Sequence, residues 1–321
     1  MTEGDAIRIA ARFGIDAAAA SELLGGYSND VWRIDAPAAR YVVRRYGRLH
    51  VSCAAIAFEH ALLAHIAPRM PEVSAPLATP EGATLLTDEG GRFVALFPYI
   101  EGTTGARDAG AAAEAAGVLA RFHRAGTDIH IAGGLRSSRT VGMLAWLREM
   151  FVRFAARDDL ARRLPWPALI AAVSGAVKRV APHAGALPHT IVHGDPHPDN
   201  IVRDTTGVRA LIDFDFAHES ERMYDVATAA DAYAREDEDG LLDFERAAAF
   251  VSAYNTAAPL AAIERSLLAV AMIRRNATLV WYVISRHGER VPGDIGGAAR
   301  YAARVTEIAH AYETIKAYVS H

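Results

Sequence analysis

The sequence lacks the features that mark secreted, membrane-spanning and nucleic-acid-binding proteins. Its one cysteine, Cys53, cannot form an intrachain disulfide, which suits a reducing compartment. A formal net charge of −4 gives no general attraction for nucleic acid or anionic membranes. The N-terminus is charged where a signal peptide is apolar, and the most apolar helical stretch, 267–273, is far too short to span a bilayer. We therefore expect a cytoplasmic protein without nucleic-acid or membrane partners; its oligomeric state is left open.

The 321 residues change character about a third of the way along the chain. Before Pro98, a helix at 5–14 precedes strand-like runs that surround one internal helix at 54–66. After Pro98, helical periodicity dominates, interrupted by a β-like region at 189–217. Helices are expected there over about 108–125, 140–157, 166–183, 225–235, 241–256, 260–286 and 298–319. Strands first and helices later indicate an α+β protein, and we predict two lobes, 1–98 and 99–321.

The residues suited to chemistry are concentrated between the predicted strands of the second lobe. Asp195 lies in a segment that Pro196 and Pro198 hold outside any helix. Asn200 follows it after four intervening residues, and Asp213 comes on the next strand-like run, a spacing typical of kinase catalytic loops. Phosphoryl transfer needs a carboxylate at the acceptor hydroxyl and oxygen ligands for Mg²⁺. The pattern therefore predicts Asp195 as the base and Asn200 and Asp213 as metal ligands, with Asp215 a weaker candidate.

These segments carry a family resemblance. The run from His193 to Asn200, together with that from Ile212 to Asp215, resembles the aminoglycoside phosphotransferase and choline kinase superfamily, which includes homoserine kinases. The resemblance implies a protein-kinase-like fold with a small antiparallel β lobe and a larger helical lobe. It also implies a small-molecule kinase that uses ATP or GTP and Mg²⁺. In that family the residue at Asp225 braces the catalytic loop.

The same resemblance extends to a predicted nucleotide site in the first lobe. The segment around Gly25 and Gly26, with Ser28 and Asn29, resembles the loop that covers the phosphates. Glycines let the backbone approach phosphate oxygens closely. An ordinary hairpin explains a Gly-Gly pair equally well, but its position one strand before Arg44 favours the nucleotide interpretation.

Arg44 departs from the kinase pattern, which places lysine on this strand and a glutamate on the following helix. We expect Arg44 to bind phosphates and to pair with Glu59; the alternative is a structural ion pair on the surface. Further on, Phe97 and Tyr99 lie in a segment that resembles the connection between lobes. Their backbone groups are candidates for contact with the nucleotide base.

Two rival functions use the same residues. A pseudokinase would bind nucleotide without turnover, and only Arg44 argues for it. A metallophosphoesterase would use His193, Asp195 and His197 as metal ligands, but the chain has no downstream Gly-Asn-His segment. A protein kinase is disfavoured because the stretch from Asp213 to Asp225 is too short for an activation segment.

The acceptor cannot be read from the sequence. Aminoglycosides, homoserine, choline-like amino alcohols and sugars all remain open. The acidic run Arg235–Asp239 could attract an amine but is more typical of a solvated helix start. Trp281 and Tyr282 are interpreted as helix packing in preference to a cation-binding wall.

Overall fold

The computed structural model describes residues 1–23, 29–47, 52–127, 129, 137–237, 239–290 and 295–319. The chain forms two compact units. The described residues of unit 1 fall within Met1–Thr104 and Ile201–Asp215, together with Ile129, and those of unit 2 fall within Gly105–Thr127, Arg136–Asn200 and Phe216–His321. Among the described helices, none is both long enough and apolar enough to cross a membrane.

Unit 1 contains a five-stranded antiparallel sheet in the order β1-β2-β3-β5-β4. Its strands are β1 (Ala19–Glu22), β2 (Asp30–Asp35), β3 (Arg40–Arg45), β4 (Leu86–Thr87) and β5 (Phe93–Pro98). Because neighbouring side chains of a strand point to opposite faces, β5 serves two cores. Val94 and Leu96 belong to one buried cluster, whereas Ala95 belongs to another, with Phe93 and Phe97 packed against it.

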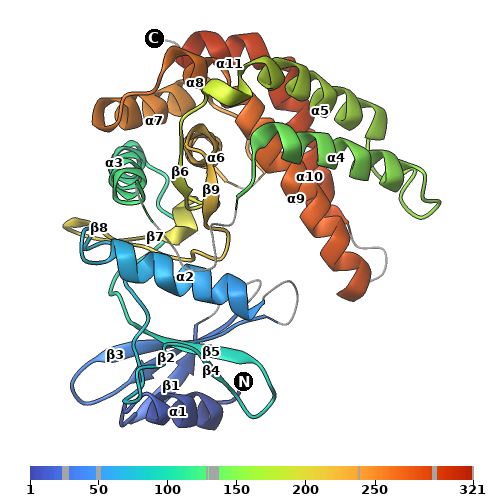
Figure 1. Ribbon diagram of the computed structural model, residues 1–321. Helices are drawn as coiled ribbons and strands as arrows, with labels where there is room; N and C mark the ends of the chain where they lie inside the picture. The colour runs from blue at the N-terminus through green and yellow to red at the C-terminus, as the bar shows by residue number, and fades with distance from the viewer. Residues whose placement is uncertain are drawn as a thin grey trace. The chain divides into compact units, whose positions relative to one another are not determined.

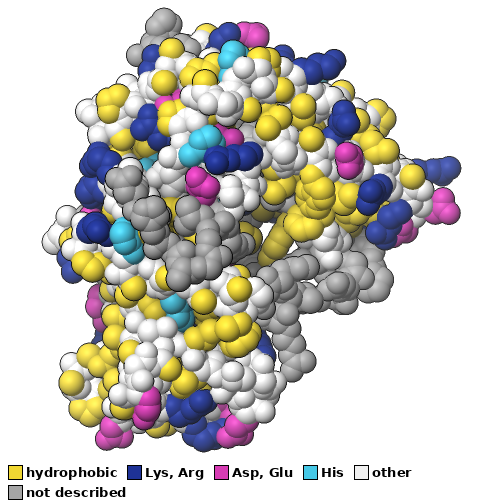
Figure 2. All heavy atoms as spheres, in the orientation of Figure 1, with side chains coloured by type: hydrophobic (Ala, Val, Ile, Leu, Met, Phe, Trp, Pro, Cys, Tyr) yellow, Lys and Arg dark blue, Asp and Glu magenta, His cyan; other side chains and the backbone are white. Residues whose placement is uncertain are grey.

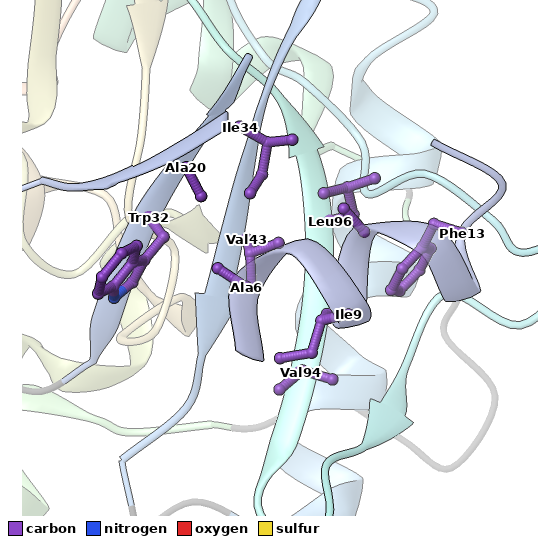
Figure 3. Close-up of a cluster of buried hydrophobic side chains, with 10 residues drawn as sticks. Ala6, Ile9, Phe13, Ala20, Trp32, Ile34, Val43, Val94 and Leu96 are labelled. Carbon is purple, nitrogen blue, oxygen red and sulfur yellow. The ribbon is translucent and has the colours of Figure 1, made fainter. Parts of the chain in front are cut away.

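One helix covers each face of this sheet (Figure 1). Helix α1 (Glu3–Arg12) is capped by the Thr2 side chain and buries Ala6, Ile9 and Ala10. Figure 3 shows Ala6 and Ile9 lying against Val43 and Val94 of the strands. Helix α2 (Cys53–Ile66) places Ile56 in the cluster of the opposite face. Each face of the sheet is therefore covered by a helix and carries its own buried cluster.

A hairpin from the middle of the chain also belongs to unit 1. Strands β7 (Ile201–Asp204) and β8 (Gly207–Leu211) pair antiparallel. The N–H of Leu211 donates to the carbonyl of Glu72 at 2.8 Å, which ties the end of β8 to unit 1. Gly102 packs against this hairpin with a φ of 150°, and an added Cβ would lie 2.5 Å from the Arg203 carbonyl oxygen, so only glycine fits there.

Unit 2 is mainly helical. Its helices are α3 (Ala109–Ala125), α4 (Thr140–Ala155), α5 (Trp166–Val180), α6 (Met223–Tyr233), α7 (Phe244–Ala257), α8 (Ala262–Ser266), α9 (Leu268–Arg290), α10 (Gly296–His310) and α11 (Tyr312–Val319), with short 3₁₀ turns η1 (Ala181–Ala186) and η2 (Pro198–Asn200). Helix α6 is buried at every residue except Ala232, and Figure 1 shows it enclosed by α3, α7 and α9. Two short strands, β6 (His189–Val192) and β9 (His218–Glu221), pair antiparallel beside it.

The α+β prediction and the protein-kinase-like layout agree with this architecture, and most predicted helices begin and end within three residues of the observed ones. The two longest predictions are wrong in one respect. The helix expected at 260–286 ends at Ser266 and restarts at Leu268, and that expected at 298–319 is interrupted at Ala311. The apolar pattern runs through the first break, because Leu267 and Leu268 are both buried, so periodicity gives no sign of it.

Candidate active site

Asp195 follows strand β6 in unit 2, as the sequence predicts, and the last two residues of that strand, Ile191 and Val192, are buried. The turn that carries it depends on Gly194, whose φ is 86°. A Cβ at that position would lie 2.3 Å from the carbonyl oxygen of Phe216. Only glycine allows this approach, so the backbone ahead of Asp195 is held in one conformation.

A buried carboxylate on α6 holds the same turn. Asp225 is fully buried and accepts hydrogen bonds from the backbone N–H groups of His193 at 2.6 Å and Gly194 at 2.8 Å. Its Oδ2 is also 3.1 Å from Nε2 of His123, and Nδ1 of His123 is 2.7 Å from the Tyr254 hydroxyl. Burial acts to raise the pKa of Asp225, but His123 and the Gly194 N–H more than offset this and hold that pKa below its ordinary value. Asp225 thus braces the loop.

Asn200 closes the loop from its other end. Its Nδ2 donates to the backbone carbonyl of Asp195 at 2.9 Å, and its own N–H donates to the carbonyl of His197 at 2.9 Å. The side chain is buried. Because the amide nitrogen is turned inward, the amide oxygen Oδ1 is the atom that could serve a hard cation.

The Asp195 carboxylate has two cationic neighbours. The Nη2 of Arg275, on α9, donates to Oδ1 of Asp195, and Nε2 of His197 lies 3.5 Å from Oδ2. Burial would raise the pKa of Asp195, but Arg275 and His197 lower it well below the usual range. Burial would lower the pKa of His197, but Asp195 and Asp199 raise it to about 9. Asp195 is therefore an ionised hydrogen-bond acceptor at neutral pH.

Unit 1 holds a second charged cluster around Arg44. Its Nη1 lies 3.1 Å from Oε1 of Glu59, and its Nη2 lies 2.7 Å from Asp213 and 2.8 Å from Asp215. The predicted pairing of Arg44 with Glu59 is confirmed, but the alternative of a surface pair is wrong, because Arg44 is 9% and Glu59 3% exposed. The Tyr46 hydroxyl donates to Oε2 of Glu59 at 3.2 Å.

This cluster contains more negative than positive groups. Three carboxylates surround one guanidinium, and burial raises the pKa of Glu59 to about 7, with Asp215 and Asp213 adding to the rise against the opposing effect of Arg44. Asp213 also adopts a φ of 66°, the left-handed region that a non-glycine residue enters only where its surroundings enforce it. Excess negative charge suits a cation, and residues with strained backbone angles are common at functional sites.

The remaining predicted nucleotide residues are only partly described. Gly25, Gly26 and Ser28 lie outside the described residues. Asn29 donates to Oδ2 of Asp215 at 2.9 Å and accepts the Gly47 N–H at 3.0 Å, so it supports the Arg44 cluster. Phe97 pairs with Val42 in the sheet, and the N–H of Tyr99 donates to the Arg40 carbonyl at 3.1 Å.

The choice of arginine at position 44 follows a feature that the motif analysis missed. Of the 34 Lys and Arg residues in the chain, only Lys178 and Lys316 are lysines, so no lysine exists before residue 178. Arginine therefore stands in place of lysine almost throughout this chain, and Arg44 is one instance of that preference.

The ligand set of the rival metallophosphoesterase does not assemble. His193 is fully buried, its ring lies edge-on to Phe122, and its Nδ1 accepts the N–H of Asp195 at 3.2 Å. Across the described parts of the chain, no group of three His, Cys, Asp or Glu side chains is arranged to hold a metal ion by itself.

The acidic run Arg235–Asp239, interpreted from the sequence as a solvated helix start, is only partly exposed. Asp237 and Asp239 are exposed, as a solvated segment should be, but Arg235 is buried. Its guanidinium pairs with Asp231 at 2.7 Å and Glu307 at 2.9 Å. The spacing of four between Asp231 and Arg235, within the helix predicted over 225–235, was a signal for this pair, although α6 itself ends at Tyr233.

Comparisons with known proteins agree with the fold and the motif. The model of the phosphotransferase enzyme family matches residues 19–260. A homoserine kinase of Polaromonas naphthalenivorans is 29% identical over 266 residues, which cover 80% of this chain and 78% of that kinase.

Solved structures confirm the protein-kinase-like fold. A microcompartment-associated aminopropanol kinase superposes with a TM-score of 0.74 at 16% identity, over 98% of each chain. A spectinomycin phosphotransferase in complex with ADP and spectinomycin gives 0.67 at 14% identity, over 98% of this chain and 99% of the other.

Proposed function

Because the chain belongs to the phosphotransferase enzyme family, whose relatives named above are kinases, we propose that it is a small-molecule kinase. It transfers the γ-phosphate of ATP, or alternatively GTP, to a hydroxyl group of a small metabolite or antibiotic. The nucleotide is bound by the predicted lobe 1–98, and the acceptor by the predicted lobe 99–321.

The observation that carries this proposal is the braced loop around Asp195. A general base must be ionised and held within hydrogen-bond reach of the acceptor hydroxyl. Gly194 and Asp225 fix the backbone ahead of Asp195, and Asn200 fixes the carbonyl of Asp195 itself. The low pKa of Asp195 keeps the carboxylate ionised, so that it can orient the acceptor hydroxyl. In this proposal it also accepts the hydroxyl proton as the phosphorus is attacked.

The charge of the Arg44 cluster supports the Mg²⁺ assignment. Magnesium usually needs only one or two protein carboxylates, because phosphate oxygens and water complete its shell. Asp213 offers a carboxylate that is 44% exposed in a cluster with surplus negative charge, and Asp215 offers a second. We assign Asn200 and Asp213 as the ligands, with Asp215 as the weaker candidate. When bound, the ion neutralises charge that develops on the phosphates.

The other nucleotide contacts follow the same proposal. Arg44, paired with Glu59, binds phosphate oxygens, and the loop with Gly25, Gly26, Ser28 and Asn29 covers them. The backbone from Phe97 to Tyr99 meets the base; since the N–H of Tyr99 already donates to Arg40, the other backbone groups of this segment make that contact.

The experiment is turnover of Mg·ATP and Mg·GTP against a panel of hydroxyl compounds, with homoserine, amino alcohols, sugars and aminoglycosides included. Asp195→Asn should lower kcat by about 10³-fold or more with nucleotide affinity nearly unchanged. Asp158→Asn, the same change at an exposed aspartate of unit 2, is the matched control.

The two rival outcomes are separable. A pseudokinase would be stabilised by nucleotide and phosphorylate nothing in the panel. Equal turnover by the wild type and Asp195→Asn would remove Asp195 from the role of base. Calorimetry of Mg·nucleotide binding to Asp213→Ala tests the metal assignment, which unchanged affinity would contradict.

A further inference from the structure

The Arg275 side chain is the least expected feature of the Asp195 environment. It lies on α9, 80 residues further along the chain, and its Nη2 donates to Oδ1 of the Asp195 carboxylate. Its side chain is 14% exposed and that of Asp195 is 16% exposed, so the pair is largely, but not fully, closed off from water.

Arg275 has donors to spare. A guanidinium carries five N–H groups in a planar fork. Among the residues that the structure describes, Asp195 is its single hydrogen-bond acceptor. Arg274, the next residue, shows the contrast: its Nη1 donates to Thr140 and Ser220 at 2.9 Å and lies 3.5 Å from Glu221. Arg274 is structural, whereas Arg275 retains unused binding capacity.

The other carboxylate near Arg275 is already committed. Asp231 contributes to the charge around Arg275, but its Oδ1 accepts from Arg235 and its Oδ2 accepts from Asn276 at 3.0 Å. The remaining groups that contribute there are the hydroxyls of Tyr224 and Tyr301. Since Arg275 bonds only the Asp195 carboxylate among the described residues, its guanidinium can bind a second anionic group.

Apolar rings border this corner of unit 2. Tyr282 lies two helical turns after Arg275 on α9, on the same side of the helix. Its ring meets that of Phe216 edge-on at 6.2 Å, and the backbone of Phe216 packs on Gly194, next to Asp195. Figure 2 shows hydrophobic side chains gathered over α4 and α9 on the visible face of unit 2. The rings of Trp146 on α4 and Trp281 on α9 meet edge-on at 5.0 Å. Such surroundings strengthen an ion pair by lowering the local dielectric.

We propose that Arg275 determines acceptor specificity by binding a carboxylate that the acceptor carries a few bonds from its reacting hydroxyl. This rests on the proposed kinase activity. The hydroxyl must reach Asp195, and Arg275 touches that same carboxylate, so a group a short carbon chain away meets the guanidinium. A planar fork of N–H donors matches a carboxylate better than it matches an ammonium or a neutral hydroxyl. The substrate class is therefore the small hydroxy acids, including hydroxy amino acids.

The experiment compares acceptors that differ only in the carboxylate. Homoserine is paired with 3-aminopropan-1-ol, and serine with ethanolamine. The wild type should prefer the acid of the pair it uses by about 100-fold in kcat/KM, because a site built around a charged partner rejects the analogue that lacks it. Arg275→Gln should lose this preference, chiefly through a higher KM for the acid, and Arg275→Lys should keep part of it. Arg153→Gln, an exposed arginine of α4, is the matched control.

The outcomes separate this inference from its premise. Equal use of both members of a pair by the wild type, or phosphorylation of acceptors without a carboxylate alone, overturns the role of Arg275 and leaves the kinase activity standing. A fall in kcat of the same size for acid and amino alcohol in Arg275→Gln also overturns it, since Arg275 would then act on the phosphoryl group or on Asp195. If no acceptor is phosphorylated at all, both proposals fail.

Discussion

Each unit places an arginine among carboxylates, and the two arrangements differ in how far the arginine is used. Arg44 in unit 1 meets Glu59, Asp213 and Asp215 and is 9% exposed. Arg275 in unit 2 pairs with one carboxylate among the described residues, that of Asp195. Negative charge is in surplus around the first arginine and balanced around the second.

The difference teaches which ligand each site can take. A cluster with surplus carboxylates favours a divalent cation, and a guanidinium with spare donors favours an anion. It also separates the stability costs of losing each arginine: without Arg44 three carboxylates lose the guanidinium that they share, whereas without Arg275 the Asp195 carboxylate keeps His197 as a cationic neighbour.

The largest expected effect comes from deleting each arginine in turn. Arg44→Met should lower the free energy of unfolding by about 3–5 kcal/mol, because it leaves buried carboxylates without their partner. Arg275→Met should cost less, about 1–3 kcal/mol, because Asp195 keeps His197 as a cationic neighbour. Urea denaturation measures both, with Arg153→Met as a surface control expected within about 0.5 kcal/mol of the wild type.

Arg44→Lys sharpens this comparison. It restores the charge but not the fork that reaches three carboxylates, so it should recover only part of the lost stability. Equal losses for Arg44→Met and Arg275→Met would contradict the distinction between a saturated and a spare arginine.

A smaller effect should appear in the pH dependence of unit 1. In the fold Glu59 keeps its proton up to a pKa of about 7, above its ordinary value of 4.5. The stability that this provides is complete below pH 4.5 and is lost as the pH rises to about 7, which amounts to about 3 kcal/mol. The difference in unfolding free energy between wild type and Glu59→Gln should fall across this window and stay level above it.

His60 also titrates near this window, but the shift of its pKa has the opposite sign. Burial and Arg44 lower the pKa of His60 to about 4, so its contribution is lost as the pH falls below its ordinary 6.5. Both proteins in the Glu59→Gln comparison carry His60, so its effect cancels. A level difference from pH 4.5 to 8 would mean that Glu59 stays ionised against Arg44.

The sequence predicts well what depends on neighbours along the chain. The strand before Asp195, the non-helical loop that follows it and the pairing of Arg44 with Glu59 all follow from local patterns and known spacing. Helix α6 is also found within two residues of its predicted start and end, since its apolar periodicity is unbroken.

What the sequence does not reveal depends on contacts between distant segments. Nothing local distinguishes Arg274, which is buried in a structural network, from Arg275, which meets Asp195. The contact of Asp215, the weaker predicted metal ligand, with Arg44 is also not visible in the sequence. The two residues are 171 positions apart, and only the tertiary fold brings them together. The break at Leu267 is likewise unmarked in the sequence, because the apolar pattern runs through it.

The smallest expected effects come from two buried tyrosines that occupy comparable places. Tyr46 of unit 1 donates to Glu59 and lies 3.1 Å from His60, and Tyr254 of unit 2 lies 2.7 Å from His123, which contacts Asp225. Removing either hydroxyl as Tyr→Phe should cost about 1 kcal/mol of stability, the usual value of one buried hydrogen bond.

The kinetic consequences of the two changes should differ even though their stabilities match. Tyr254→Phe loosens the brace of the Asp195 loop, so kcat should fall several-fold with little change in the KM for nucleotide. Tyr46→Phe loosens the Arg44 cluster, so the KM for nucleotide should rise while kcat is nearly kept. Steady-state kinetics at saturating acceptor measures both. The same change in kcat and KM for both variants would show that the two hydrogen-bond networks do not serve separate steps.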